Sequence, residues 1–137
     1  MTITGGCRCG QVRYEIAAEA PISARYCWCR DCQYFSGGAG MANAVFNKDA
    51  IKVVGETRVF TSTADSGATM RRSFCASCGS PLFSEAEPRP HLIIVRVGSL
   101  DDREIGKPSA IIWTKSAPKW ACFDPALPQS EGGAPAK

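Results

Sequence analysis

The sequence predicts a mainly β domain with little helix, and three observations support this prediction. Apolar and polar side chains alternate along residues 11–16, which is the period of a half-buried strand. No long window places apolar residues at the 3.6-residue spacing of a helix. Glycine, proline and aspartate interrupt the chain at short intervals, as they do between short strands. The chain has 137 residues, the length of one domain.

In chain order, the alternating stretch is followed by one short helix and then by further strands. The helix is expected over about residues 30–36, because two glycines follow at positions 37 and 38. The strand-forming stretches after it are 51–54, 58–61, 80–83, 91–97 and 110–114.

The end of the chain has a different composition. It is rich in proline, glycine and alanine and has no apolar period. We therefore expect one β domain over residues 1–125 and a flexible tail over residues 126–137.

Seven of the eight cysteines fall into three tight clusters, which read CRC from residue 7, CWCRDC from residue 27 and CASC from residue 75. The N-terminus has no basic and apolar regions of a secretory signal, and no apolar run approaches the ~20 residues that span a bilayer. We therefore expect a cytoplasmic protein with no membrane partner. In a reducing compartment, clustered cysteines indicate metal binding or catalysis more than disulfides.

Cys7, Cys9, Cys75 and Cys78 are the candidate ligands of a structural zinc. Four thiolates fill a tetrahedral zinc shell, and a complete shell is typical of a structural site. A glycine follows each pair, which suits the tight turn of a zinc knuckle. The i, i+2 step between Cys7 and Cys9 is expected to be strand-like, with both sulfurs on one side.

Cys27, Cys29 and Cys32 are the candidate ligands of a second, catalytic zinc. Three protein ligands leave the fourth position to water or substrate, as in catalytic zinc sites. Cys122 or His91, the single histidine, could instead complete the shell, and an iron–sulfur cluster held with Cys122 is a further alternative. An open zinc can hold a thiol as its thiolate or polarise a carbonyl, and both suit a reaction between a thiol and an aldehyde.

The formal net charge of +3 does not indicate a nucleic-acid partner. Seven zinc-bound thiolates would remove seven charges and two zinc ions would return four, so the metallated chain is close to neutral. No run of five basic residues is present.

Several residues around the second cluster have both a functional and a structural interpretation. Arg30 could attract a carboxylate and Asp31 could accept a proton, or both could simply begin a helix. Tyr26 and Trp28 could form the wall of a pocket. Three aromatic residues near the C-terminus could cap an open metal or belong to the core. They are Trp113, Trp120 and Phe123.

The chain resembles the glutathione-dependent formaldehyde-activating (Gfa-like) family, which includes the domain of centromere protein V. The resemblance covers roughly residues 3–125 and rests on GCRCGQVRYE from residue 6, CWCRDC from residue 27, RSFCASCG from residue 72, and Trp113 with Lys119-Trp120. It implies an Mss4-like (β-tent) fold with a structural zinc on Cys7, Cys9, Cys75 and Cys78. It also implies a catalytic zinc on Cys27, Cys29 and Cys32.

The resemblance further implies a carbon–sulfur lyase similar to S-(hydroxymethyl)glutathione synthase, which joins a thiol such as glutathione to an aldehyde such as formaldehyde. The alternative, from a different class, is a non-catalytic module that zinc holds together and that binds a partner. Neither the true substrate nor the oligomeric state can be derived from the sequence.

Overall fold

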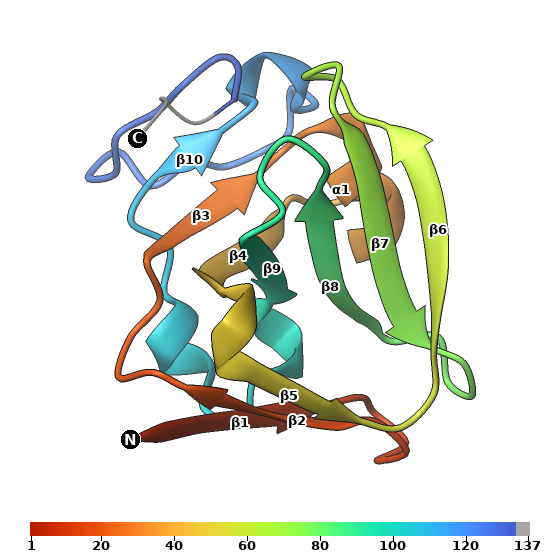
Figure 1. The fold of residues 1–137 in the computed structure, drawn as a ribbon. Coiled ribbons are helices and arrows are strands. Elements are labelled where there is room, and N and C mark those ends of the chain that lie inside the picture. The colour runs from red at the N-terminus through yellow and green to blue at the C-terminus, as the bar shows by residue number, and fades with distance from the viewer. Residues whose placement is uncertain (134–137) are drawn as a thin grey trace.

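Two β-sheets, one small and one large, form the framework of residues 1–133, the part of the chain described by the computed structural model (Figure 1). The small sheet has the order β1-β2-β5, with β1 at Thr2–Gly6, β2 at Arg13–Ala17 and β5 at Ile51–Val54. It lies at the lower end of the view in Figure 1, below the large sheet. In β2, buried Tyr14 and Ile16 alternate with exposed neighbours, so one face of this sheet points to the core.

The large sheet has seven strands in the order β10-β3-β4-β9-β8-β7-β6. Neighbouring strands are antiparallel except for the pair β10 and β3, which is parallel. The strands are β3 (Ser23–Cys27), β4 (Met41–Asn47), β6 (Thr57–Thr63), β7 (Thr69–Cys75), β8 (Pro81–Ala86), β9 (Leu92–Arg96) and β10 (Ile111–Ile112).

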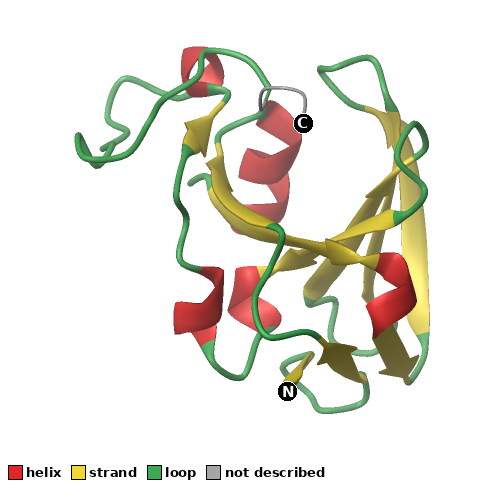
Figure 2. Cartoon of the chain, turned by 60° about the vertical axis from the view of Figure 1, so that its left-hand side comes forward, coloured by secondary structure: helices red, strands yellow, loops and turns green. Residues whose placement is uncertain are grey.

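Within residues 1–133 there is one α-helix, α1 (Arg30–Ser36), which contacts β4 and lies beside the curved strands of the large sheet (Figure 2). Gly37 ends it with a positive φ of 89°, a conformation that glycine adopts without strain. The remaining helical turns are short 3-10 segments: η1 (Lys48–Ala50), η2 (Val97–Ser99), η3 (Arg103–Gly106) and η4 (Thr114–Ser116).

The main hydrophobic core lies between the two sheets. The small sheet contributes Tyr14 and Ile16, and the large sheet contributes Phe46, Leu82 and Val95, all at most 2% exposed. A second, smaller cluster forms where β3, β4 and β10 meet α1, and it contains three of the cysteines. The main core and the cluster with these three cysteines are therefore two separate apolar regions of the molecule.

The expected mainly β class is confirmed, and so are the helix over 30–36 and the strands near 12–16, 51–54, 58–61, 80–83, 91–97 and 110–114. Four further strands, β1, β3, β4 and β7, were not predicted. β1 ends in two glycines and β4 contains alanines and asparagines, all weak strand formers. Their pairing with distant strands, not their local propensity, makes them extended.

Part of the predicted tail runs beside β10. Ile111 N–H donates to Pro128 O at 2.9 Å, and Ser130 N–H donates to Ile111 O at 2.9 Å. Trp113 N–H donates to Gly132 O at 2.8 Å. The division of the chain at residue 125 stays a prediction, and residues 134–137 of the tail lie outside the described residues.

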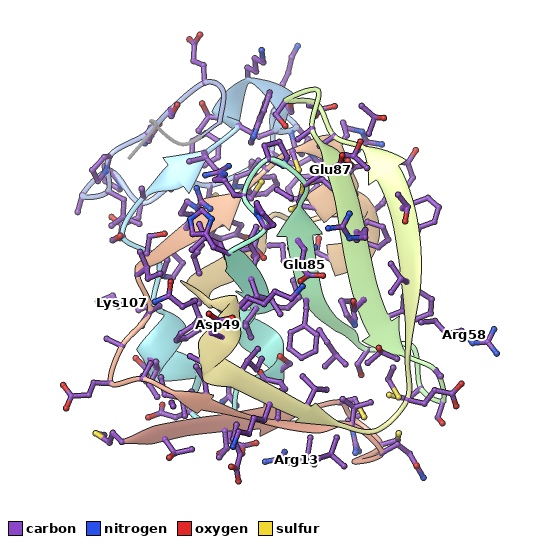
Figure 3. The ribbon with its side chains drawn as sticks, viewed as in Figure 1. Arg13, Asp49, Arg58, Glu85, Glu87 and Lys107 are labelled. Atoms are coloured by element: carbon purple, nitrogen blue, oxygen red, sulfur yellow. The ribbon has the colours of Figure 1, made fainter. Side chains whose placement is uncertain are left out.

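Charged side chains lie on several sides of the molecule. In Figure 3, Arg13, Arg58 and Lys107 lie at three different edges of the view, so these three bases do not form one patch. The prediction that the protein does not bind nucleic acid stays a prediction. In residues 1–133, no helix has both the length and the apolar character needed to cross a membrane.

Candidate metal centres

The cysteines Cys7, Cys9, Cys75 and Cys78 come together as one cluster, the four-cysteine cluster. The sulfurs of Cys7 and Cys9 are 3.5 Å apart, and those of Cys9 and Cys75 are 3.8 Å apart. Zinc–sulfur bonds of about 2.3 Å in a tetrahedron place sulfurs roughly 3.8 Å apart. The donor set and its spacing therefore fit a zinc ion.

Backbone amides point at these sulfurs. Val12 N–H donates to Cys7 Sγ at 3.2 Å, and Ser77 and Cys78 N–H donate to Cys75 Sγ at 3.3 and 3.4 Å. Such N–H···S bonds stabilise a sulfur as thiolate, the form that binds metal. They arise because both segments fold into tight turns around a sulfur.

The expected strand-like step between Cys7 and Cys9 is wrong. β1 ends at Gly6, and the chain turns so that Gly10 N–H donates to Cys7 O at 3.2 Å. Gly10 has φ 83° and Gly79 has φ 76°, so the predicted glycine-dependent turn is present in both pairs. A turn brings two sulfurs of neighbouring residues closer to a common centre than an extended strand does.

The four-cysteine cluster joins the two sheets. Cys7 follows β1 of the small sheet, and Cys75 is the last residue of β7 in the large sheet. A further bond between the same two turns runs from Arg8 N–H to Ser80 Oγ at 3.0 Å. A metal held here would cross-link segments that are distant in sequence, as the structural role predicts.

Cys27, Cys29 and Cys32 form the three-cysteine cluster, with all three residues at most 8% exposed. Cys27 ends β3, Cys29 is the N-cap of α1, and Cys32 lies in the first turn of that helix. Cys29 caps the helix with its sulfur, which accepts a hydrogen bond from Cys32 N–H at 3.4 Å. The strand end and the helix start therefore bring three sulfurs within 4.8 Å of one another.

No fourth histidine, cysteine or acidic ligand joins this cluster within residues 1–133. Cys122 is exposed and contacts Trp120 O through its sulfur at 3.9 Å. His91 is exposed at the start of β9 and belongs to neither cluster. The structure therefore does not bring either candidate fourth ligand to the three-cysteine cluster.

The three cysteines of this cluster differ in acidity: their surroundings lower the pKa of Cys32 and raise the pKa of Cys27 and of Cys29. Hydrogen bonds from Cys27 and Cys29, with smaller contributions from Arg96 and Asn43, lower the pKa of Cys32 to about 3. Hydrogen bonds with the other two thiols, together with burial, raise the pKa of Cys27. The surroundings of Cys32 therefore favour its thiolate form, the form that binds metal.

A buried polar pair supports that sulfur. Asn43 Nδ2 lies 3.8 Å from Cys32 Sγ, and Arg96 Nη1 donates to Asn43 Oδ1 at 2.7 Å. Arg96 is 5% exposed and Asn43 is 7% exposed. The bond from Arg96 fixes the amide so that its N–H₂ end faces the sulfur.

The aromatic residues divide into two groups. Phe35 and Trp113 pack against the three-cysteine cluster. Trp28 is instead stacked on Tyr26, with ring centres 5.4 Å apart, and its edges meet Trp120 and Phe123. Of the three aromatics considered as a cap, Trp113 therefore contacts the cluster, and the other two cover Trp28.

The two charged residues inside the CWCRDC motif point in different directions. Asp31 accepts a hydrogen bond from Arg72 Nη2 at 3.1 Å, an ion pair between α1 and β7. Arg30 donates to Gln33 Oε1 at 2.8 Å and lies over the ring of Tyr34. Asp31 thus orients a buried arginine, whereas Arg30 is a helix-surface residue.

A cavity of about 640 Å³ connects the surroundings of both clusters. Its lining includes Cys7 and Arg8 at one side and Phe35, Met41 and Arg96 at the other. Phe35 and Met41 also pack against the three-cysteine cluster. At that end of the cavity, the side chains of Phe35 and Met41 separate the cavity from the three-cysteine cluster.

Sequence reasoning missed Asn43 and Arg96. Both are polar residues inside otherwise apolar strands, MANAVF and LIIVRV, and this interruption is the signal that could have identified them. Their partners could not be identified in the same way, because β4 and β9 are distant in sequence.

Known proteins are similar to most of this chain in sequence or in fold. A family model described as "Glutathione-dependent formaldehyde-activating enzyme" matches residues 2–116. A protein from Halomonas elongata, provisionally named a glutathione-dependent formaldehyde-activating enzyme, is 28% identical over 126 residues, which are 88% of this chain and 80% of that protein. A crystal structure of a Rhodobacter sphaeroides protein has the same fold, with a TM-score of 0.59 and 22% identity over 77% of this chain and 96% of that one.

Proposed function

The chain belongs to the glutathione-dependent formaldehyde-activating family, and from this membership we propose that it is a zinc-dependent enzyme that joins a thiol to an aldehyde. The thiol is of the glutathione type, the aldehyde is of the formaldehyde type, and the reverse release is a carbon–sulfur lyase reaction. The proposal includes two zinc ions per chain and a cytoplasmic location, where the eight free cysteines stay reduced.

The observation that carries this proposal is the buried three-cysteine cluster with no fourth protein ligand in residues 1–133. Three cysteine sulfurs within 4.8 Å of one another suit zinc, and the missing fourth ligand leaves a position for a substrate sulfur. The four-cysteine cluster of the same chain differs in having four candidate ligands, a complete set for a structural zinc.

Zinc bound at the three-cysteine cluster would supply a positive centre that keeps a substrate thiol in its thiolate form. The chain's own residues then determine the surroundings of that sulfur. Asn43 keeps an N–H donor toward Cys32 Sγ, and Arg96 holds Asn43 in that orientation. Phe35 and Trp113 cover the cluster with apolar surface, which limits the access of water.

In the proposed reaction, a carbon–sulfur bond forms as the carbonyl π bond breaks. The thiol loses its proton, and the carbonyl oxygen gains one, so that a thiol and an aldehyde give a hydroxyalkyl thioether. No oxidant or reductant is required.

Carbon-13 exchange NMR tests the proposal directly. With labelled formaldehyde and reduced glutathione, the zinc-loaded protein should increase the exchange rate between free aldehyde and adduct above the buffer rate. The increase should disappear in Cys32→Ser and persist in Cys122→Ser, which removes an exposed sulfur outside both clusters. If the exchange rate with the wild-type protein were no higher than in buffer alone, the non-catalytic binding module would be favoured instead.

A further inference from the structure

A second cavity, of about 280 Å³, lies between the β7–β8 region and α1. Its walls are mostly aromatic and apolar, formed by Phe35, Phe74, Phe83 and Pro81. Two arginines, Arg72 and Arg96, also line it. An apolar cavity with two guanidinium groups in its wall suits a small molecule that has an apolar body and an oxygen at one end.

Arg96 has unused hydrogen-bonding capacity at this cavity. Arg96 is only 5% exposed. Within residues 1–133 its side chain makes a single hydrogen bond, from Nη1 to Asn43. Its Nε is buried without a partner in the same residues. A buried donor without a partner costs free energy, and a ligand oxygen that reaches the guanidinium can recover part of it.

Arg72 differs from Arg96 in its partners. It donates to Asp31 Oδ2 and to Ser62 Oγ, and its Nε is also without a partner. Its charge is therefore matched by a carboxylate. Arg96 has no carboxylate partner among the ion pairs of residues 1–133, and through Asn43 it faces the sulfur of Cys32.

This charge arrangement favours a neutral ligand over an anionic one. Three thiolates with one zinc ion carry a net charge of −1, which balances Arg96, and Asp31 balances Arg72. A carboxylate would add an uncompensated charge to an apolar cavity. A carbonyl oxygen accepts the same hydrogen bonds without adding a negative charge to the cavity.

The cavity is adjacent to the proposed reaction site. Phe35 lines it and also packs against the three-cysteine cluster. Arg96 reaches Cys32 through Asn43 alone. A carbonyl group held at Arg96 would thus lie on the side of the cavity that faces the sulfurs.

We propose that this cavity binds the substituent of an aldehyde larger than formaldehyde, while the guanidinium group of Arg96 binds its carbonyl oxygen. Formaldehyde has no substituent to fill the space, whereas a cavity of about 150 Å³ already accommodates benzene. The aromatic walls indicate an aldehyde with an aromatic or branched apolar group. The catalytic part of this inference rests on the proposed function.

Arg96 would act on the charge that develops during the addition. As the thiolate sulfur bonds to the carbonyl carbon, the π electrons move to the oxygen, which then takes up the proton released by the thiol. A fixed guanidinium stabilises the oxygen more in this state than in the starting carbonyl, because its negative charge is larger there.

Binding can be measured without any reaction by using phenylacetamide, an unreactive carbonyl compound with an aromatic body. Calorimetry on the zinc-loaded protein should show saturable binding, weakened about 10-fold or more in Arg96→Met, which keeps the apolar volume but removes the donors. Ser73→Leu, which fills the cavity, should also weaken it, whereas Thr61→Leu on the exposed edge strand β6 should not. Tighter binding of phenylacetate than of phenylacetamide would overturn the proposal, as would equal binding to wild type and Ser73→Leu.

An activity comparison then separates this inference from the proposed function. Ser73→Leu should lower kcat/KM for phenylacetaldehyde about 10-fold and leave that for formaldehyde within twofold. Equal losses for both aldehydes would overturn the inference and leave the proposed function intact. If neither aldehyde reacted but phenylacetamide still bound through Arg96, the proposed function would fail and the carbonyl-binding cavity would stand.

Discussion

Cys27 and Cys32 differ in acidity although they belong to one cluster. The pKa of Cys32 is lowered to about 3 by hydrogen bonds from Cys27 and Cys29, whereas the pKa of Cys27 is raised by its bonds to the same neighbours. Zinc needs all three residues as thiolates, so its binding must displace the protons of Cys27 and Cys29.

This acidity difference gives a pH prediction with a definite sign. Because protons compete with zinc, the zinc affinity of the three-cysteine cluster should rise with pH, by up to ~100-fold per unit where two protons are displaced. This affinity can be measured from the transfer of zinc to a chelator at pH 6, 7 and 8. The zinc that Cys27→Ser lacks in the same measurement is the zinc of the three-cysteine cluster. An affinity for this metal that does not change with pH would contradict the assignment.

Tyr14 gives a second residue-scale prediction, at the interface of the two sheets. Its hydroxyl donates to Ser99 Oγ at 2.7 Å, because the Ser99 hydroxyl itself donates to Arg96 O at 2.8 Å. Burial raises the pKa of Tyr14 to about 12 from its ordinary value of 10. The folded state therefore keeps the proton that the unfolded chain loses above pH 10, and stability falls as pH rises from 10 to 12.

Tyr14→Phe should remove this dependence. At pH 7 the variant should lose about 1 kcal/mol of unfolding free energy with the hydrogen bond. Above pH 10 its stability should decline less steeply than that of wild type. Urea unfolding at pH 7 and pH 10.5 measures both effects, and parallel declines in the two proteins would show that Tyr14 is not the group responsible.

At the scale of elements, local sequence predicts some segments and not others. α1 could be predicted because the glycines at positions 37 and 38 end it, a signal that lies in the local sequence, whereas its N-cap, Cys29, is known only from the structure. β7 could not, since its sequence TMRRSFC has no clear alternation and its extended form depends on β6 and β8 on either side. Tertiary pairing supplies what local propensity lacks there.

The pairing of residues 128–133 with β10 gives an element-scale prediction. A chain that ends after Leu127 loses the acceptors of Ile111 and Trp113 N–H, so these amides should exchange with solvent at least ~10-fold faster. A chain that ends after Gly133 retains both acceptors and is the matched control. Equal protection of the two amides in both truncated chains would show that the segment does not hold β10.

At the scale of the whole molecule, the sequence predicted ligand types better than their surroundings. All seven clustered cysteines are predicted from spacing, and the structure brings them together as four and three. The two cavities and the buried arginines could not be predicted, because they form where strands that are distant in sequence lie side by side. The part of the site proposed to bind the substrate therefore depends on the assembled sheets.

The central claim is that the chain holds two zinc ions in sites of different ligand number. Native mass spectrometry of the purified wild-type protein and of Cys32→Ser tests it most directly. We predict two zinc ions per wild-type chain and one per variant chain, with the variant still folded because the four-cysteine cluster joins the two sheets. One zinc in the wild-type chain, or two in the variant, would contradict this account.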